Sequence, residues 1–86
     1  MKTIRVYEKG EPDVLTYEDA PDPTPGPGEV LIRVRAVGVN FADHLMRIGA
    51  YPTDESPFIP GLEAAGTVDA LGQEVHGLEV GQPVIA

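Results

Sequence analysis

The chain has 86 residues, no cysteine, and fourteen acidic against six basic side chains, which gives a formal net charge of -8. This length suffices for one small domain that buries only about 60% of the surface its unfolded chain exposes. The lack of cysteine excludes disulfides and thiolate metal sites. The acids are spread along the chain without any basic run, which argues against nucleic acid as a partner and indicates an ordinary solvated surface in preference to a site for a cationic ligand.

The first segment alternates polar and apolar side chains from Met1 to Val6, and no apolar run in the chain is long enough to cross a bilayer. We therefore expect no signal peptide, no membrane partner and a cytoplasmic location. Residues 2–7 predict a strand, residues 10–13 a turn, and residues 14–18 the strand that returns from it.

A proline-rich connection and a long strand come next. Residues 21–28 contain four prolines, whose fixed φ and missing N–H exclude a central strand and predict a stiff surface loop within one domain. Residues 29–39 then alternate as a strand. One face would carry Val30, Ile32, Val34 and Ala36, and the other, expected to face solvent, would carry Leu31, Arg33, Arg35 and Val37.

The apolar period changes after Gly38. Phe41, Leu45 and Ile48 follow one another at i, i+4 and i+7, which predicts a short helix near residues 41–49. Asn40 is placed to cap this helix, Asp43 can bring a carboxylate to its unpaired amides, and Gly49 suits its C-terminal end.

The last third returns to strands and turns. Residues 51–60 predict a polar loop, and residues 61–71 a strand in which Gly66 marks a bulge or a close backbone approach. Gly72, Gly77 and Gly81 indicate turns, and residues 83–86 begin a further strand. Because a fresh strand end exposes unpaired backbone groups, we expect a domain that is truncated at its C-terminal end.

An ordered set of motifs covers nearly the whole chain. It consists of GVNFAD at 38–43, RIGAY at 47–51 and PFIPGLEAAGTV at 57–68, flanked by PGPGEVL at 25–31 and GLEVGQPV at 77–84. In its order and spacing this set resembles the zinc-independent quinone oxidoreductases of the medium-chain dehydrogenase/reductase superfamily. One departure is Gln82, where the family usually has Asp, and we expect it to affect only a turn.

The resemblance implies a mainly β fold, a partial chaperonin-10-like β-barrel with one short helix, in which residues 1–86 form the N-terminal substrate-side domain. The Rossmann domain of such enzymes is absent from this chain, because no strand is followed by a glycine-rich turn and a helix. Gly61 and Gly66 lie in a predicted strand and do not form that fingerprint. We therefore expect the chain alone not to bind NADPH tightly, and the resemblance implies that the full-length enzyme is a homodimer.

The zinc ligands of related alcohol dehydrogenases are missing. At the positions that resemble those of a ligating cysteine and a ligating histidine, this chain has Asn40 and Leu62. Zinc prefers sulfur and imidazole nitrogen, and these side chains offer one weak donor between them. His44 and His76 have no second ligand at a useful spacing and are interpreted as surface histidines, so we expect no metal.

The resemblance also implies the reaction, in which a hydride passes from NADPH to a quinone or a related activated carbonyl or alkene acceptor. It places Asn40 and Phe41 at the nicotinamide, and Tyr51 together with Asn40 at the acceptor; no residue is assigned as catalytic. Asp43 and Arg47 would support the helix. Structural alternatives remain open: Asn40 as a helix cap, Phe41 as a core anchor, Asp43 as a capping partner and Arg47 as a solvated side chain.

A second hypothesis from a different functional class is a non-catalytic chaperonin-10-like module that serves folding or protein interaction. It shares the predicted fold with the first hypothesis. The two differ in whether a nucleotide-binding domain follows residue 86, which would show as strand and helix repeats with a glycine-rich turn.

Overall fold

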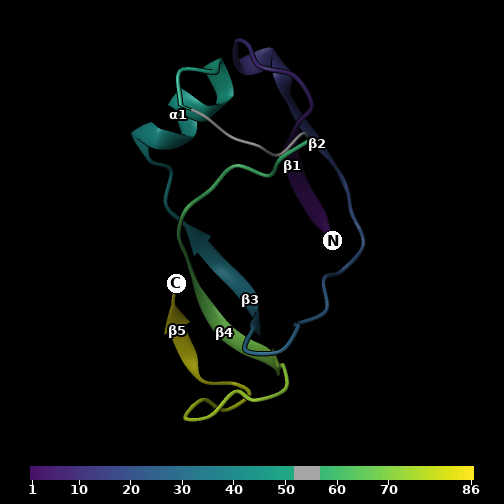
Figure 1. Ribbon diagram of the computed structural model, residues 1–86, viewed down its shortest axis with the longest axis vertical. Coiled ribbons are helices and arrows are strands. Elements are labelled where there is room, and N and C mark those ends of the chain that lie inside the picture. Colours follow the sequence, from purple (N-terminus) through teal and green to yellow (C-terminus); the bar gives the residue numbers. More distant parts are fainter. Residues whose placement is uncertain (52–56) are drawn as a thin grey trace. The chain divides into compact units, whose positions relative to one another are not determined.

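A computed structural model of the chain describes residues 1–51 and 57–86 (Figure 1). These residues form two compact units. The first unit combines Met1–Pro21 with Val39–Leu62, and the second combines Asp22–Gly38 with Glu63–Ala86. The described residues are mainly β, with one α-helix, and their strands form a two-stranded and a three-stranded sheet without a closed barrel. This confirms the predicted fold class.

The first unit begins with a β-hairpin. Strand β1 (Lys2–Val6) pairs antiparallel with β2 (Leu15–Asp19), with Lys2 opposite Asp19 and Val6 opposite Leu15. A short 3-10 turn, Pro12–Val14, leads into β2, with proline at a position where its missing N–H costs nothing. The strand, turn and strand predicted for residues 2–18 are confirmed.

The core of the first unit forms where Phe58 meets β1. Val6 and Phe58 exchange backbone hydrogen bonds, from Val6 N to Phe58 O at 2.9 Å and from Phe58 N to Val6 O at 3.1 Å. Both side chains are buried. The sequence pattern missed this contact because Phe58 lies in the segment predicted as a polar loop, of which residues 52–56 are outside the described part.

Helix α1 (Phe41–Ile48) is the other element of the first unit, and it confirms the predicted helix. Gly49 ends it in the left-handed conformation, with φ of 86°, which glycine adopts without the strain a side chain would bring. The backbone N–H of Gly10 donates to Arg47 O at 2.9 Å and so ties the last turn of α1 to the hairpin loop.

The second unit is an antiparallel sheet in which β4 (Ala64–Leu71) lies between β3 (Val30–Val37) and β5 (Pro83–Ile85) (Figure 1). A Cβ on Gly66 would collide with the backbone oxygen of Arg33 on the neighbouring strand. The predicted close backbone approach at Gly66 is therefore confirmed, as is the strand that begins at Pro83.

The predicted faces of β3 are wrong in their second half. The register with β4 shifts between Leu31 and Ile32 and again between Val34 and Ala36. Such irregularities change which side chains share a face, so the alternation does not continue. Val34, expected on the inner face, is 52% exposed, and Ala36 is also exposed.

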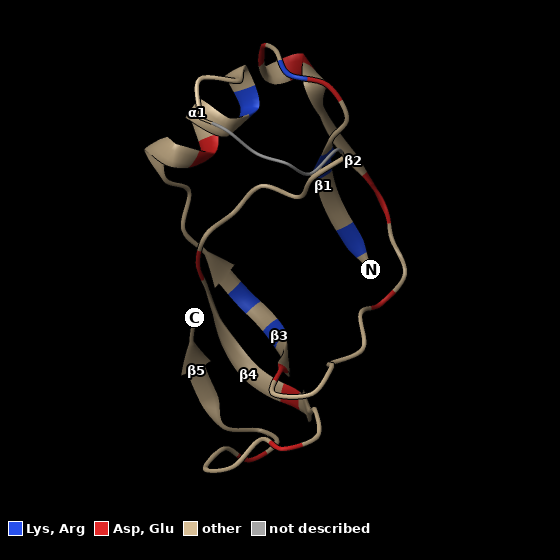
Figure 2. Ribbon diagram, in the orientation of Figure 1, with Lys and Arg blue, Asp and Glu red and all other residues tan. Residues whose placement is uncertain are grey.

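Basic residues lie on β1, α1 and β3 (Figure 2). Several form exposed ion pairs, such as Lys2 with Asp19 at 2.9 Å and Arg33 with Asp69 at 3.3 Å, and pairs of this kind stabilise a fold only slightly. Within the described ranges, no helix has both the length and the apolar character needed to traverse a bilayer.

Candidate functional site

The start of helix α1 is built by Asn40 and Asp43. Asn40 has extended backbone angles, φ of -112° and ψ of 160°, and occupies the N-cap position. The Asp43 carboxylate accepts a hydrogen bond from Asn40 N at 2.9 Å, and Asp43 N donates to the Asn40 carbonyl at 3.0 Å. The structural alternatives for these two residues, cap and capping partner, are therefore realised, while a role of Asn40 at a ligand stays a prediction.

Phe41 points out of the fold. Its side chain is 72% exposed, and that of the preceding Val39 is 87% exposed. The alternative in which Phe41 anchors the core is wrong, because the buried side of α1 is the one that carries Asp43. Val39 and Phe41 thus present apolar surface beside the Asn40 amide, at the first turn of the helix.

Tyr51 follows the other end of α1 and is 51% exposed. Its backbone N–H donates to the Leu45 carbonyl at 3.2 Å, so the chain position next to the helix end is fixed. Asn40 and Phe41 are chain neighbours, but a helix of eight residues, about 12 Å long, separates them from Tyr51. The structure thus places the three predicted site residues in one unit, at opposite ends of one helix.

A row of side chains along α1 was not predicted as functional. The rings of Phe41 and His44 are stacked, with centroids 5.5 Å apart and planes inclined by 27°. The Arg47 guanidinium lies 2.9 Å from His44 Nδ1. These residues follow one another at i, i+3 and i+6, and that spacing is the signal by which sequence reasoning could have grouped them.

Asp43 is the one buried charged side chain of the helix. One carboxylate oxygen holds the N-cap, and the other, Oδ1, is buried without a hydrogen-bond partner in the described part of the chain. Since an unsatisfied buried acceptor is costly, Asp43 fixes the helix start at some expense in stability.

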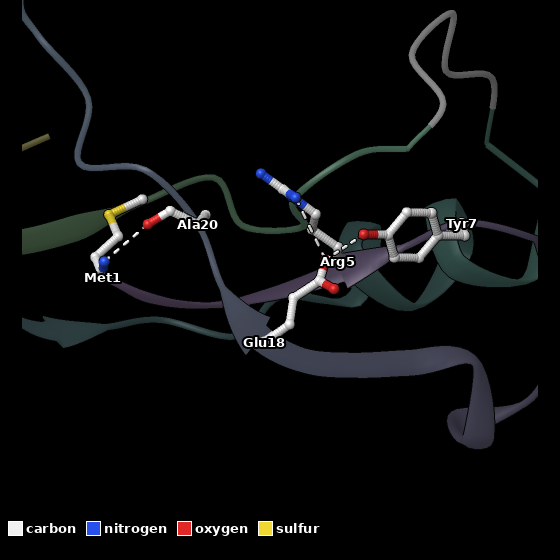
Figure 3. A network of polar contacts seen from close by, with 5 residues as sticks. All are labelled: Met1, Arg5, Tyr7, Glu18 and Ala20. Atoms are coloured by element: carbon white, nitrogen blue, oxygen red, sulfur yellow. Dashed lines mark hydrogen bonds and ion pairs between the residues drawn. The ribbon is translucent and has the colours of Figure 1, made fainter.

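A second polar cluster lies on the hairpin (Figure 3). The Tyr7 hydroxyl donates to Glu18 Oε1, and the Arg5 guanidinium donates to the same oxygen at 3.4 Å. The pKa of the Arg5 guanidinium is raised above its ordinary value, chiefly by a hydrogen bond with Tyr7 and also by the Glu18 carboxylate. Arg5 therefore stays charged, and the cluster joins β1 to β2 on an accessible surface.

The second unit contains a cavity of about 300 Å³ at the end of its sheet. Its lining is apolar except for one carboxylate, that of Glu63, and consists of Ala36, Val37, Gly38, Glu63, Ala64, Ala65 and Ile85. The Glu63 side chain lies against Gly38, where a Cβ would collide with it. None of the predicted site residues lines this cavity.

The described residues fit only part of a dinucleotide cofactor. The exposed ring of Phe41 and the neighbouring apolar surface suit a flat ring such as nicotinamide. No described helix follows a strand through a glycine-rich turn, which is the arrangement that would hold the pyrophosphate. Among residues 1–51 and 57–86, no group of three or more His, Asp or Glu side chains is placed to hold a metal ion.

Comparison with known proteins identifies the family. The sequence profile of the alcohol dehydrogenase GroES-like domain matches residues 26–86. A quinone oxidoreductase of Pseudomonas aeruginosa is 45% identical over 83 residues, which are 96% of this chain and 26% of that protein. An acryloyl-coenzyme A reductase of Sulfurisphaera tokodaii is 42% identical over 86 residues, which are 100% of this chain and 25% of that protein.

Solved structures agree with this assignment. The Escherichia coli quinone oxidoreductase in complex with NADPH superposes with a TM-score of 0.95 at 32% identity, over 99% of this chain and 26% of that one. This chain thus spans about a quarter of the length of the relatives it matches and corresponds to their N-terminal part. These matches confirm the resemblance that the sequence motifs indicated. The chain therefore belongs to the alcohol dehydrogenase GroES-like domain family, within the medium-chain dehydrogenase/reductase superfamily.

Proposed function

We propose that this chain forms the acceptor-side part of an NADPH-dependent oxidoreductase that transfers hydride to a quinone or to a related conjugated carbonyl or alkene. The observation that carries the proposal is the match of nearly the entire chain, with 45% identity, to a quinone oxidoreductase. The match to a protein solved with NADPH supports the choice of cofactor.

The named substrates of the relatives share one chemical feature. Quinones and acryloyl thioesters both have an alkene conjugated to a carbonyl group. Such acceptors gain a hydride at an electron-poor atom of the conjugated system, and negative charge then develops on the carbonyl oxygen. The nicotinamide supplies the hydride, so the protein has to orient the acceptor, exclude water and stabilise this charge.

The residues at α1 are suited to this task. Phe41 would support one face of the nicotinamide, and the Asn40 amide would hold its polar edge while its backbone N–H stays bonded to Asp43. Tyr51 would line the acceptor pocket from beyond the helix end. No acid or base group is assigned to the hydride transfer itself, because the cofactor supplies both electrons.

The test compares two proteins: the 86-residue chain, and an extended chain in which a nucleotide-binding domain follows it, taken from its own reading frame or from a relative. We expect NADPH oxidation dependent on a benzoquinone or on cyclohexenone for the extended chain, and none above background for the 86-residue chain. Comparable turnover by both proteins would refute the proposal that this chain forms only the acceptor side and needs a nucleotide-binding domain. No turnover by the extended chain with any conjugated carbonyl would favour the non-catalytic module.

A further inference from the structure

Phe41, His44 and Arg47 form a row on α1 in which Phe41 stacks on the His44 ring and Arg47 contacts its Nδ1. A guanidinium has only donors, so in the 2.9 Å contact Arg47 donates and His44 Nδ1 accepts. An imidazole whose Nδ1 accepts a hydrogen bond carries its ring hydrogen on Nε2. His44 is thereby held as an Nε2–H donor.

The orientation of this ring is fixed from its other side as well. Phe41 stacks on it at 5.5 Å, and all three residues come from one regular helix whose start and end are both capped. Holding a polar group by packing and by a hydrogen bond before the ligand arrives lowers the reorganisation that binding would require. The row therefore has the structure of a preorganised donor.

The donor is also available. His44 is exposed, and Nε2 has no hydrogen-bond partner in the described part of the chain. It lies one helical turn from Phe41, the residue proposed to support the nicotinamide. A flat acceptor that extends from Phe41 along this side of the helix would bring a carbonyl oxygen toward the imidazole.

We infer that His44 donates a hydrogen bond from Nε2 to the carbonyl oxygen of the acceptor, and that Arg47 is the positioning residue that holds the imidazole in this tautomer. This inference rests on the proposed function and adds the group that stabilises the developing charge. It reverses the interpretation of His44 as a plain surface histidine.

The electron and proton balance is simple. A conjugated alkene gains the hydride at the carbon β to its carbonyl, its π electrons move to the carbonyl oxygen, and the nicotinamide is left oxidised. The oxygen accepts the hydrogen bond from His44 throughout, and the resulting enolate takes one proton from water at the α-carbon. With a quinone, the hydroquinone anion takes this proton on oxygen. His44 is not consumed or oxidised.

The kinetic test uses the extended chain with NADPH and cyclohexenone. We expect His44→Leu to lower kcat by about 10²-fold, the lower end of what loss of one oxyanion donor costs, with little change in the KM for NADPH. His44→Gln, which keeps an N–H donor on a side chain of similar reach, should restore a large part of the loss. His76→Leu is the matched control, because His76 is also exposed but lies in the second unit.

The Arg47→Met variant distinguishes a residue that positions His44 from one that contacts the acceptor itself. We expect a smaller loss of kcat than for His44→Leu, and almost no further loss when both changes are combined, because Arg47 acts through His44. Additive losses, or unchanged kcat in His44→Leu while the parent stays active, would overturn the inference and leave the proposed function standing.

A binding measurement keeps the inference testable even if the extended chain does not turn over. In protein with isotope-labelled histidine, magnetic resonance reports which imidazole nitrogen carries the hydrogen. We expect His44 to be the Nε2–H form in the parent and a mixture in Arg47→Met, and cyclohexenone added with NADP⁺ to shift the His44 Nε2 signal and leave His76 unaffected. A hydrogen on His44 Nδ1, or equal responses of the two histidines, would overturn the inference.

Discussion

At the residue scale, the structural role of Asn40 at the start of α1 is compatible with the ligand role proposed for it. The Asn40 N–H donates to the Asp43 carboxylate at 2.9 Å, and the Asn40 side-chain oxygen takes part in the capping box, which leaves the NH2 of the amide for other contacts. Phe41 is 72% exposed and contributes little to burial. An exposed aromatic beside a fixed amide is the kind of surface that binds a flat polar ring.

Tyr51 gives a prediction at this scale. Tyr51→Phe keeps the ring and removes the hydroxyl, and because the side chain is half exposed, we expect the thermal unfolding of the extended chain to be nearly unchanged. If the hydroxyl contacts the acceptor, kcat/KM for a benzoquinone falls while the affinity for NADPH does not. Unaltered quinone kinetics together with a clear loss of stability would assign Tyr51 to the packing of the fold and remove it from the site.

At the element scale, local signals account for most of what could be predicted. The alternation before Val6, the prolines after residue 20 and the change of period after Gly38 each fix an element through short-range geometry, and β1, the connection and α1 appear where these signals lie. Burial was less predictable. The exposure of Phe41 and the buried backbone pairing of Phe58 depend on which segments meet in space, and neither has a periodic signal in the sequence.

The candidate site shows the same limit. Asn40, Phe41 and Tyr51 were identified through the family motif, and their order along the chain already implied that they flank one helix. The contact between Arg47 and His44 was not predicted, because spacing three residues apart on a helix permits the contact without requiring it. The tautomer inferred for His44 depends on this contact, because a guanidinium can only donate.

The pairing of β3 with β4 gives a prediction about Gly66. An alanine Cβ here would overlap the Arg33 carbonyl, so the two strands would have to separate, and we expect Gly66→Ala to cost about 3 kcal/mol, the upper end of ordinary single substitutions. Gly77→Ala is the control: its φ is +85° but nothing lies near the added Cβ, so only backbone strain of about 1–2 kcal/mol is expected. Thermal unfolding of the extended chain compares them, and equal losses would mean that the strands can shift to admit a Cβ.

The cap of α1 gives a second prediction about stability. We expect Asn40→Ala and Asp43→Ala each to lower the free energy of unfolding by about 1 kcal/mol, since each removes one of the two side chains of the capping box. Asp69→Ala removes a carboxylate of an exposed ion pair and should cost at most about 0.5 kcal/mol. Denaturant titrations of the three variants measure these losses, and a loss for Asp69→Ala as large as for Asp43→Ala would show that the cap contributes no more than an exposed ion pair.

At the scale of the whole molecule, this chain supplies about a quarter of the length of its relatives. Large apolar side chains are exposed in both units, among them Val39 and Phe41 in the first and Ile85 in the second. In the proposed enzyme, the cofactor and the acceptor would cover the surface at α1. The chemistry of that enzyme then depends on which groups this part contributes, and in particular on whether a metal or a hydrogen-bond donor meets the acceptor oxygen.

The last prediction concerns that choice. Asn40 and Leu62 occupy the positions that resemble those of two zinc ligands in alcohol dehydrogenases of the superfamily, and neither an amide nor an isobutyl group can replace a thiolate or an imidazole. We therefore expect the extended chain, purified in metal-free buffer, to contain well below one zinc per chain, and treatment with a chelator to leave kcat for a benzoquinone unchanged. A zinc-dependent alcohol dehydrogenase handled in parallel should retain its metal and lose activity on chelation. One tightly held zinc per extended chain would contradict the prediction, and it would also weaken the assignment of the developing charge to His44, because a Lewis acid at the same oxygen would leave that hydrogen bond little to stabilise.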